Sequence, residues 1–194
     1  MKILHLVFHP NLARSRVNMT WKEQIEESGI AAVSRDLYAD YLDFQIDVER
    51  EQADLLAHDR IVFQFPFYWY SVPPLFKKWM DDVLKFNFAY GTKGDKLAGK
   101  DMQLIVSVGG PAEAYMPGGY NNFSIPELLK PLQQTANLTR MQFLPPLWMH
   151  GAVAVNEDEI RGAMDSWLEL LADPERADPW SAQRKIIAKA AKSG

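Results

Sequence analysis

The sequence of 194 residues contains no cysteine. Disulfide bonds, metal sites built from thiolates and cysteine nucleophiles are therefore excluded together. Stability must come from a packed core, and any chemistry must come from other side chains or from a bound group. Because 47% of the residues are hydrophobic, the chain is apolar enough to form one domain, residues 1–194, around a single core.

An excess of positive charge is also absent. Twenty-five aspartates and glutamates outnumber 21 lysines and arginines, which gives a formal net charge of -4 and a pI near 5.6. Proteins that bind nucleic acid usually present a basic surface, so we expect no nucleic-acid partner.

Long apolar runs are absent as well. No segment approaches the ~20 apolar residues that a membrane-spanning helix requires. The N-terminal segment "MKILHLVFHP" lacks a small-residue cleavage site and is typical of a first core strand rather than a signal peptide. We expect a cytoplasmic protein that could lie at the inner face of the membrane only through a partner.

Metal-ligand spacing and hydrolase motifs are missing too. The four histidines fall in separate predicted elements, so no metal site is expected; they are His5, His9, His58 and His150. We expect His5 in the core and His58 at a helix end. Neither a G-x-S-x-G nucleophile elbow nor a P-loop is present, so serine hydrolase and nucleoside triphosphatase activities have no support.

The sequence does contain strand-type segments that alternate with helical patterns, which is typical of an α/β protein with a parallel sheet. Most of them are nearly continuously apolar, as in strands covered on both faces. In chain order they are residues 3–8, 31–38, 60–65, 102–108 and 140–149. They predict a flavodoxin-like three-layer sandwich, with helices on both faces of a five-stranded sheet in the order 2-1-3-4-5.

Apolar spacing predicts the helices. One follows Pro73 and Pro74, another covers residues 125–136, and a third begins at the N-cap Asn156, whose reciprocal capping partner is Glu159. A last helix is expected from Asp178 and Pro179. The segment "IDVEREQ" is interpreted as a solvated helix face capped by Asp47, and residues 87–100 as a surface loop.

In a sheet of this order, ligands bind beyond the carboxyl ends of the strands, near the point where the strand order reverses. The first loop there, residues 9–18, leads into a helix for which Ser15 is a candidate N-cap. Free N–H groups and the helix dipole at that helix start would suit a phosphate. On this loop alone it stays open whether Ser15 merely caps the helix and Asn18 lies on the surface.

The loops after the third and fourth predicted strands complete a candidate site. "FYWY", residues 67–70, could wall a flat ring system, although two of these rings could instead cover the core or a subunit interface. "SVGGPAEAY", residues 107–115, contains two glycines that allow close backbone approach to a ligand. Together the three loops predict a pocket for a mononucleotide with a planar head group.

An ordered set of motifs resembles those of a known family. In chain order the motifs are "HP" with the following Ser15 and Asn18, "YLDFQIDVEREQ", "FPFYWYSVPPLFKKW", "AYG", "LAGK" and the glycine pair. They are similar to the NAD(P)H:quinone oxidoreductases of DT-diaphorase type, and most closely to the ancillary proteins of glutathione-regulated potassium-efflux systems. The resemblance covers nearly the whole chain. It implies a homodimer with the site at the interface, in which NAD(P)H reduces a flavin and the flavin reduces a quinone by ping-pong kinetics. It favours FMN over FAD, since the extra C-terminal segment of the longer diaphorases is missing.

The same resemblance implies roles for individual residues. The contacts to the flavin phosphate and ribityl chain are His9, Ser15, Arg16, Val17 and Asn18. The contacts along the isoalloxazine ring are Pro66, Phe67, Tyr68 and Trp69. The third segment consists of Ser107, Val108, Gly109 and Gly110, in which Val108 stands where the family commonly has a threonine.

Tyr115 matches a tyrosine near the pyrimidine edge of the flavin. With the backbone of Gly109 and Gly110 it is the candidate group that stabilises negative charge during reduction. Asn121 stands where the diaphorases have a histidine, and an asparagine cannot ionise.

Two other functions remain in view. One is a flavin-binding regulatory subunit of a membrane potassium-efflux antiporter with little turnover of its own. The other is a one-electron flavodoxin, which is disfavoured because such carriers are usually strongly acidic.

Overall fold

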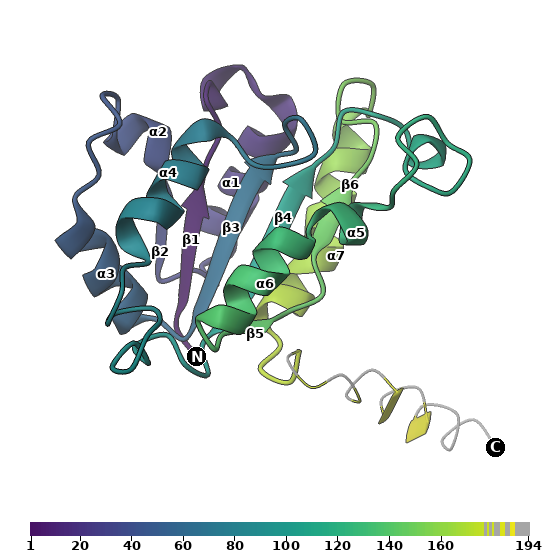
Figure 1. The fold of residues 1–194 in the computed structure, drawn as a ribbon. Coiled ribbons are helices and arrows are strands. Elements are labelled where there is room, and N and C mark those ends of the chain that lie inside the picture. The colour runs from purple at the N-terminus through teal and green to yellow at the C-terminus, as the bar shows by residue number, and fades with distance from the viewer. Residues whose placement is uncertain (177, 179, 181–182, 185–186, 189–194) are drawn as a thin grey trace.

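The computed structural model describes residues 1–176, 178, 180, 183–184 and 187–188. A twisted sheet lies between two layers of helices (Figure 1). Its strand order is β2-β1-β3-β4-β5, and every pairing is parallel, as the sequence predicts. The strands on this path are β1 (Ile3–Val7), β2 (Val33–Asp36), β3 (Arg60–Pro66), β4 (Asp101–Ser107) and β5 (Gln142–Phe143).

The last predicted strand, residues 140–149, is in fact two short strands, and the prediction of one continuous strand is wrong. β5 pairs with the start of β4, whereas β6 (Leu147–Met149) pairs with its end. Pro145 and Pro146 lie between them. Proline has no N–H to donate to a neighbouring strand, so the ladder is interrupted there.

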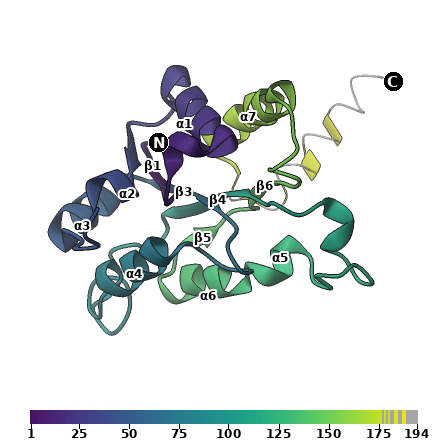
Figure 2. The same cartoon turned by 90° about the horizontal axis from the view of Figure 1, so that it is seen from above.

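The helices divide between the two faces of the sheet (Figure 2). α1 (Arg16–Ser28) and α7 (Glu157–Ala172) pack together on one face. The opposite face is covered by α3 (Val48–Ala57), α4 (Pro74–Val83) and α6 (Lys130–Leu138). The short helices α2 (Leu37–Asp40) and α5 (Ile125–Leu128), and the 3₁₀ turns Leu12–Arg14 and Ala112–Ala114, complete the described elements.

The predicted helix starts are confirmed. Ser15 caps α1 and Asp47 caps α3, each accepting a hydrogen bond from the backbone N–H three residues on. Asn156 and Glu159 form the reciprocal capping box of α7. The helix predicted over residues 125–136 is divided into α5 and α6, because Pro131 cannot donate the hydrogen bond that would continue the first helix. The helix expected from Asp178 and Pro179 falls on a stretch whose residues lie largely outside the described ones.

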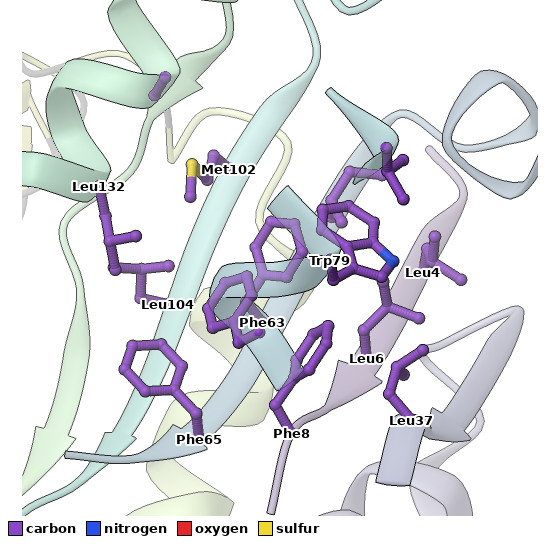
Figure 3. Close-up of a cluster of buried hydrophobic side chains, with 14 of the residues drawn as sticks. Leu4, Leu6, Phe8, Leu37, Phe63, Phe65, Trp79, Met102, Leu104 and Leu132 are labelled. Carbon is purple, nitrogen blue, oxygen red and sulfur yellow. The ribbon is translucent and has the colours of Figure 1, made fainter. Parts of the chain in front are cut away.

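An aromatic cluster fills the core on the face covered by α4 (Figure 3). Phe8 stacks on Phe76 with ring centroids 4.3 Å apart, and Phe63 and Trp79 pack edge to face 5.5 Å apart. The four aromatic side chains that strand β3 and helix α4 contribute to this cluster are all buried, namely Phe63, Phe65, Phe76 and Trp79.

Two expectations about the surface need correction. Within "IDVEREQ", Glu51 is 1% exposed and forms a 2.7 Å ion pair with Arg35, so this helix face is not wholly solvated. Residues 87–100 contain no described helix or strand, as expected of a loop, but Ala89 and Leu97 are fully buried in the core. Both features depend on partners from distant segments.

His5 lies in the centre of the sheet, as predicted. Its ring nitrogens lie 3.0 Å from the Ser34 hydroxyl and 3.0 Å from the Gln64 side-chain oxygen. Burial lowers the pKa of His5 to about 4, although the bond to Gln64 opposes that shift.

The lowered pKa predicts a pH dependence of stability. Between pH 6.5 and 4 the unfolded chain binds a proton at His5 that the folded chain does not, so the free energy of unfolding should fall as the pH falls, by up to about 3 kcal/mol. Urea denaturation of the parent and of His5→Gln at pH 7 and pH 4.5 measures this contribution. Equal losses in the two proteins would show that His5 is not its source.

Candidate functional site

A cleft of about 520 Å³ opens at the carboxyl edge of the sheet, where β1, β3 and β4 end. This volume lies within the usual range for small-molecule sites. The three predicted loops all contribute to its walls. Ten predicted contacts line the cleft, namely His9, Ser15, Arg16, Val17, Asn18, Pro66, Phe67, Tyr68, Ser107 and Gly109.

One end of the cleft is formed by the N-terminus of α1. The Ser15 hydroxyl accepts hydrogen bonds from the backbone and the side-chain amide of Asn18, at 3.2 and 3.1 Å. Neither bond uses the hydroxyl proton of Ser15, which is therefore available to a ligand. The backbone N–H groups of the first turn face the same end, as they do at every helix start.

Asn18 joins the first and third loops. Its side chain is 2% exposed and donates to the Ser107 hydroxyl at 2.9 Å, while Gln64 donates to its backbone oxygen at 2.7 Å. The alternative that Asn18 is a surface residue is therefore wrong. This buried link fixes the start of α1 against the end of β4.

The charges around this end are positive. Arg14 and Arg16 line the cleft, and none of its described lining residues is acidic, although the protein carries a net charge of -4. His9 accepts a hydrogen bond from the Asn11 amide on Nδ1 at 3.1 Å, and burial lowers its pKa. A neutral His9 would therefore carry its proton on Nε2, free to donate. Hydroxyl, helix start and guanidinium groups together match the chemistry of a phosphate.

Only the first part of the aromatic segment after β3, up to Tyr68, lines the cleft. Phe67 and Tyr68 line the cleft, but Trp69 is 91% exposed and lies outside its walls. Tyr68 and Ser71 exchange backbone hydrogen bonds across a two-residue turn, in which Trp69 and Tyr70 have φ of 49° and 61°. Such a turn normally uses glycine or asparagine, because a side chain costs about 1–2 kcal/mol per residue in this conformation.

The glycine loop after β4 presents only part of itself to the cleft. Ser107 and Gly109 are in its walls, whereas the Val108 side chain is fully buried and its N–H donates to the Met149 carbonyl at 2.8 Å. Val108, which stands where the family commonly has a threonine, therefore faces the core. Gly110 packs on Tyr115, where a Cβ atom would come within 3.0 Å of the ring.

Tyr115 stands beside the cleft rather than in its walls. Its ring packs edge to face on Phe67, with centroids 6.3 Å apart, and so joins the second and third loops. Burial raises the pKa of Tyr115, and the neighbouring Tyr70 and Tyr120 raise it further, which keeps its hydroxyl protonated at neutral pH. Asn121, which stands where the diaphorases have a histidine, accepts a hydrogen bond from the Tyr70 hydroxyl at 2.9 Å.

Part of the cleft was not predicted from the sequence. Asn11 and Arg14 come from the first loop, and Ala152 and Val153 from the loop after β6. The Arg16 side chain donates to the Val155 carbonyl at 2.8 Å and ties that last loop to α1. One signal was available: a loop that follows the strand next to β4 must emerge at the same edge of a parallel sheet.

Metal-binding clusters and membrane-spanning helices are both absent from the described residues. They contain no cluster of three or more histidine, aspartate or glutamate side chains that could hold a metal ion. No helix in the described part of the chain is both long enough and apolar enough to cross a membrane.

Curated proteins similar to this chain include some named as oxidoreductases and some named as ancillary proteins of an efflux system. The protein YdeQ of Bacillus subtilis, named as an uncharacterized NAD(P)H oxidoreductase, is 47% identical over 90% of this chain and 88% of its own length. The ancillary protein KefG of the glutathione-regulated potassium-efflux system of Cronobacter sakazakii is 39% identical over 89% of this chain and 94% of its own length.

Solved structures add a bound cofactor. General stress protein 14 of Treponema denticola, in complex with FMN, is 36% identical with a TM-score of 0.82 over 88% of this chain and 98% of its own. A protein from P. pentosaceus named NADPH-quinone reductase is 35% identical with a TM-score of 0.79 over the same shares, 88% and 98%. A protein from Streptomycin violaceusniger named thermophilic tryptophan halogenase is 44% identical with a TM-score of 0.83, again over 88% and 98%.

The family model for the flavodoxin-like fold matches residues 1–171, which include every described strand and every residue that lines the cleft. The relatives described above cover a similar share of this chain. This chain therefore belongs to the flavodoxin-like family that the model describes.

Proposed function

We propose that this protein binds FMN in the cleft and acts as an NAD(P)H-dependent oxidoreductase that reduces a quinone-type acceptor. The observation that carries the proposal is the composition of the cleft: a cationic, acid-free end at the start of α1 and an aromatic wall after β3 share one space. A phosphate and a flat ring would each find their usual partners there. The FMN complex of a relative 36% identical supports the choice of cofactor over FAD.

The phosphate would lie at the start of α1. The Ser15 hydroxyl, the amides of the first turn and the guanidinium of Arg16 are the donors we assign to it, with His9 donating from Nε2. Asn18 holds this end in place through its bonds to Ser15 and Ser107. Its role is to orient rather than to carry charge.

The ring would lie between the second and third loops. When bound, FMN supplies the hydride chemistry, and this chain supplies binding and orientation. Pro66, Phe67 and Tyr68 offer the flat wall, and Gly109 allows close approach of the backbone opposite. The Tyr115 hydroxyl and the amides of Gly109 and Gly110 are the donors we propose for charge that develops at the ring edge.

The open side of the cleft would accept NAD(P)H and then the acceptor. Because both would use the same surface in turn, we expect ping-pong kinetics. The acceptor is proposed as a quinone from the family resemblance and from the name of a relative 35% identical. Proteins that share this fold carry different functional names, as the halogenase name of another relative shows. Turnover measurements with different acceptors must therefore identify the acceptor.

An absorbance experiment tests this proposal directly. The purified protein with added FMN should show a protein-bound flavin spectrum that bleaches with NADPH or NADH under anaerobic conditions and returns when a quinone is added. Failure to bind FMN would refute the assignment of the cleft. Binding without recovery by quinone would refute the acceptor alone.

The relative named KefG gives the second candidate its support. In that case this protein would bind a potassium-efflux antiporter at the membrane, and the bound flavin would serve regulation. Slow turnover of the isolated protein, together with co-purification of a co-expressed antiporter, would favour this function.

We also propose that the protein is a homodimer in which a second copy covers the rim of the cleft. Trp69 and Tyr120 are 91% and 73% exposed beside the cleft, and Val153 in its wall is 81% exposed. Apolar side chains exposed together often mark a contact surface. Placing Trp69 outward in a strained turn is consistent with a role in contact.

A charge placed on this rim should disrupt the dimer. We expect Trp69→Lys to raise the dimer dissociation constant by at least about tenfold, since burying an unpaired charge is costly. Sedimentation over a concentration series measures it. The control is Leu138→Lys, which changes a 58% exposed side chain at the end of α6. Equal effects of both variants, or a parent that is monomeric throughout, would contradict the proposal.

A further inference from the structure

His150 lies directly after β6, beside the glycine loop, and its ring is held by an unusual partner. The indole nitrogen of Trp148 donates a hydrogen bond to Nε2 of His150 at 3.0 Å. An indole N–H can only donate, so Nε2 must be unprotonated while this bond exists. A neutral His150 therefore carries its proton on Nδ1.

The Nδ1 atom faces the glycine loop. It is buried and makes no well-aligned hydrogen bond to any described residue. The Gly110 carbonyl is nevertheless close enough to favour a proton on the ring. The Gly110 carbonyl already accepts a hydrogen bond from the Gly151 N–H at 3.0 Å, so the segment after β6 is joined to the glycine loop at this point. A buried donor without a well-made bond calls for an explanation.

The ring of His150 also supports Tyr115. The two ring centroids are 5.4 Å apart at an interplanar angle of 40°. Tyr115 in turn packs on Gly110 and on Phe67. His150 thus neighbours the two groups proposed to face the edge of the flavin ring, and it is not among the residues that line the cleft.

We propose that His150, in its neutral form with the proton on Nδ1, is the positioning residue that holds Gly110 and Tyr115 for flavin reduction; this rests on the proposed function. Because it does not line the cleft, we assign it no direct contact with cofactor or substrate. Asn121 does not serve this purpose, because its side-chain oxygen is already bound by the Tyr70 hydroxyl. The charged and titratable groups that face His150 are Glu113 and Tyr115. Burial lowers the pKa of His150, while Gly110 and Glu113 oppose that shift, so the neutral form dominates at pH 7.

Two substitutions separate positioning from mere packing. His150→Asn keeps a donor near the position of Nδ1, and His150→Leu removes it. We expect His150→Leu to slow flavin reduction by NADPH about tenfold in stopped-flow measurements, and His150→Asn to restore the rate to within about threefold of the parent. The FMN dissociation constant should change less than about threefold in both, because the phosphate donors at α1 are untouched. His58→Asn, at the end of α3, is the control for loss of a buried histidine elsewhere.

The tautomer itself is measured on the unmodified protein by ¹⁵N-histidine NMR at pH 7, with and without FMN, and His150→Asn identifies the signal. A neutral ring protonated on Nδ1 is expected. A proton on Nε2, or a charged ring at pH 7, would overturn the proposal, as would a His150→Leu variant that is reduced at the parent's rate. Failure of the parent to bind FMN at all would refute the proposed function and with it the positioning role.

Discussion

Replacing Ser15 by aspartate is expected to weaken FMN binding by about 100-fold or more while the fold remains intact. Aspartate caps helices as well as serine does, so its carboxylate would still accept the hydrogen bond from the Asn18 N–H. The change removes the hydroxyl donor and places a negative charge where we assign the phosphate. Two unit charges 4 Å apart repel by roughly 4 kcal/mol at an effective dielectric constant of 20, which corresponds to far more than tenfold in affinity.

Riboflavin provides the matched ligand for this test, because it has the same ring without the phosphate. Fluorescence titration of the parent and of Ser15→Asp should show a large loss for FMN and little change for riboflavin. The control variant is Asp47→Ser, which makes the reverse exchange at the N-cap of α3, outside the cleft walls. Equal losses for both flavins would show that the start of α1 does not bind the phosphate.

Replacing Arg35 by methionine is expected to lower the free energy of unfolding by about 3–5 kcal/mol. Arg35 is 8% exposed and forms 2.7 Å ion pairs with Glu51, Asp40 and Asp54. Burial alone would lower the pKa of Arg35, but Glu51 and Asp40 raise it above its ordinary value. Methionine would fill most of the space of the side chain and supply no charge.

The decrease in the free energy of unfolding should arise mainly from Glu51, which is 1% exposed. Without Arg35 its carboxylate would retain two neutral donors, the Tyr41 hydroxyl at 2.6 Å and the Trp79 indole at 2.8 Å. A buried carboxylate that loses its cation must take up a proton or remain uncompensated. The double variant Arg35→Met with Glu51→Gln should therefore recover part of the loss.

Urea denaturation at pH 7 measures these free energies. The control is Arg50→Met, because Arg50 is 48% exposed and lies 3.7 Å from Asp40, and such exposed pairs contribute less than about 1 kcal/mol. A loss for Arg50→Met as large as for Arg35→Met would contradict the argument from burial.

The strands, the caps and the three loops of the cleft were predictable because each rests on a short-range signal, and the alternation of strands with helices matched the known order 2-1-3-4-5. Apolar runs such as residues 60–65 report burial on both faces, and a parallel sheet then brings the loop ends to one edge. The interruption at Pro145 and Pro146 was visible in the sequence, and its consequence follows from the missing N–H groups. The outward turn at Trp69 was not predictable, because its φ of 49° contradicts what the residue prefers.

The interior contacts of charged and polar groups were beyond the sequence. Glu51 looks like part of a solvated helix face until Arg35, 16 positions away in the chain, is seen to pair with it at 2.7 Å. The link from Asn18 to Ser107, 89 residues apart, and the bond from Arg16 to the Val155 carbonyl, 139 apart, carry no periodicity. His150 likewise gains meaning only from Trp148, Gly110 and Tyr115 around it.

The sequence by itself therefore determined the fold class, the helix starts and which loops would meet at one edge of the sheet. These features depend on backbone hydrogen bonding and on apolar spacing, which act over a few residues and repeat along the chain. Only the tertiary structure decided which side chains line the cleft, which rings turn outward and which buried charges pair. Those outcomes depend on the packing of segments far apart in sequence, where a displacement of one residue would exchange one neighbour for another.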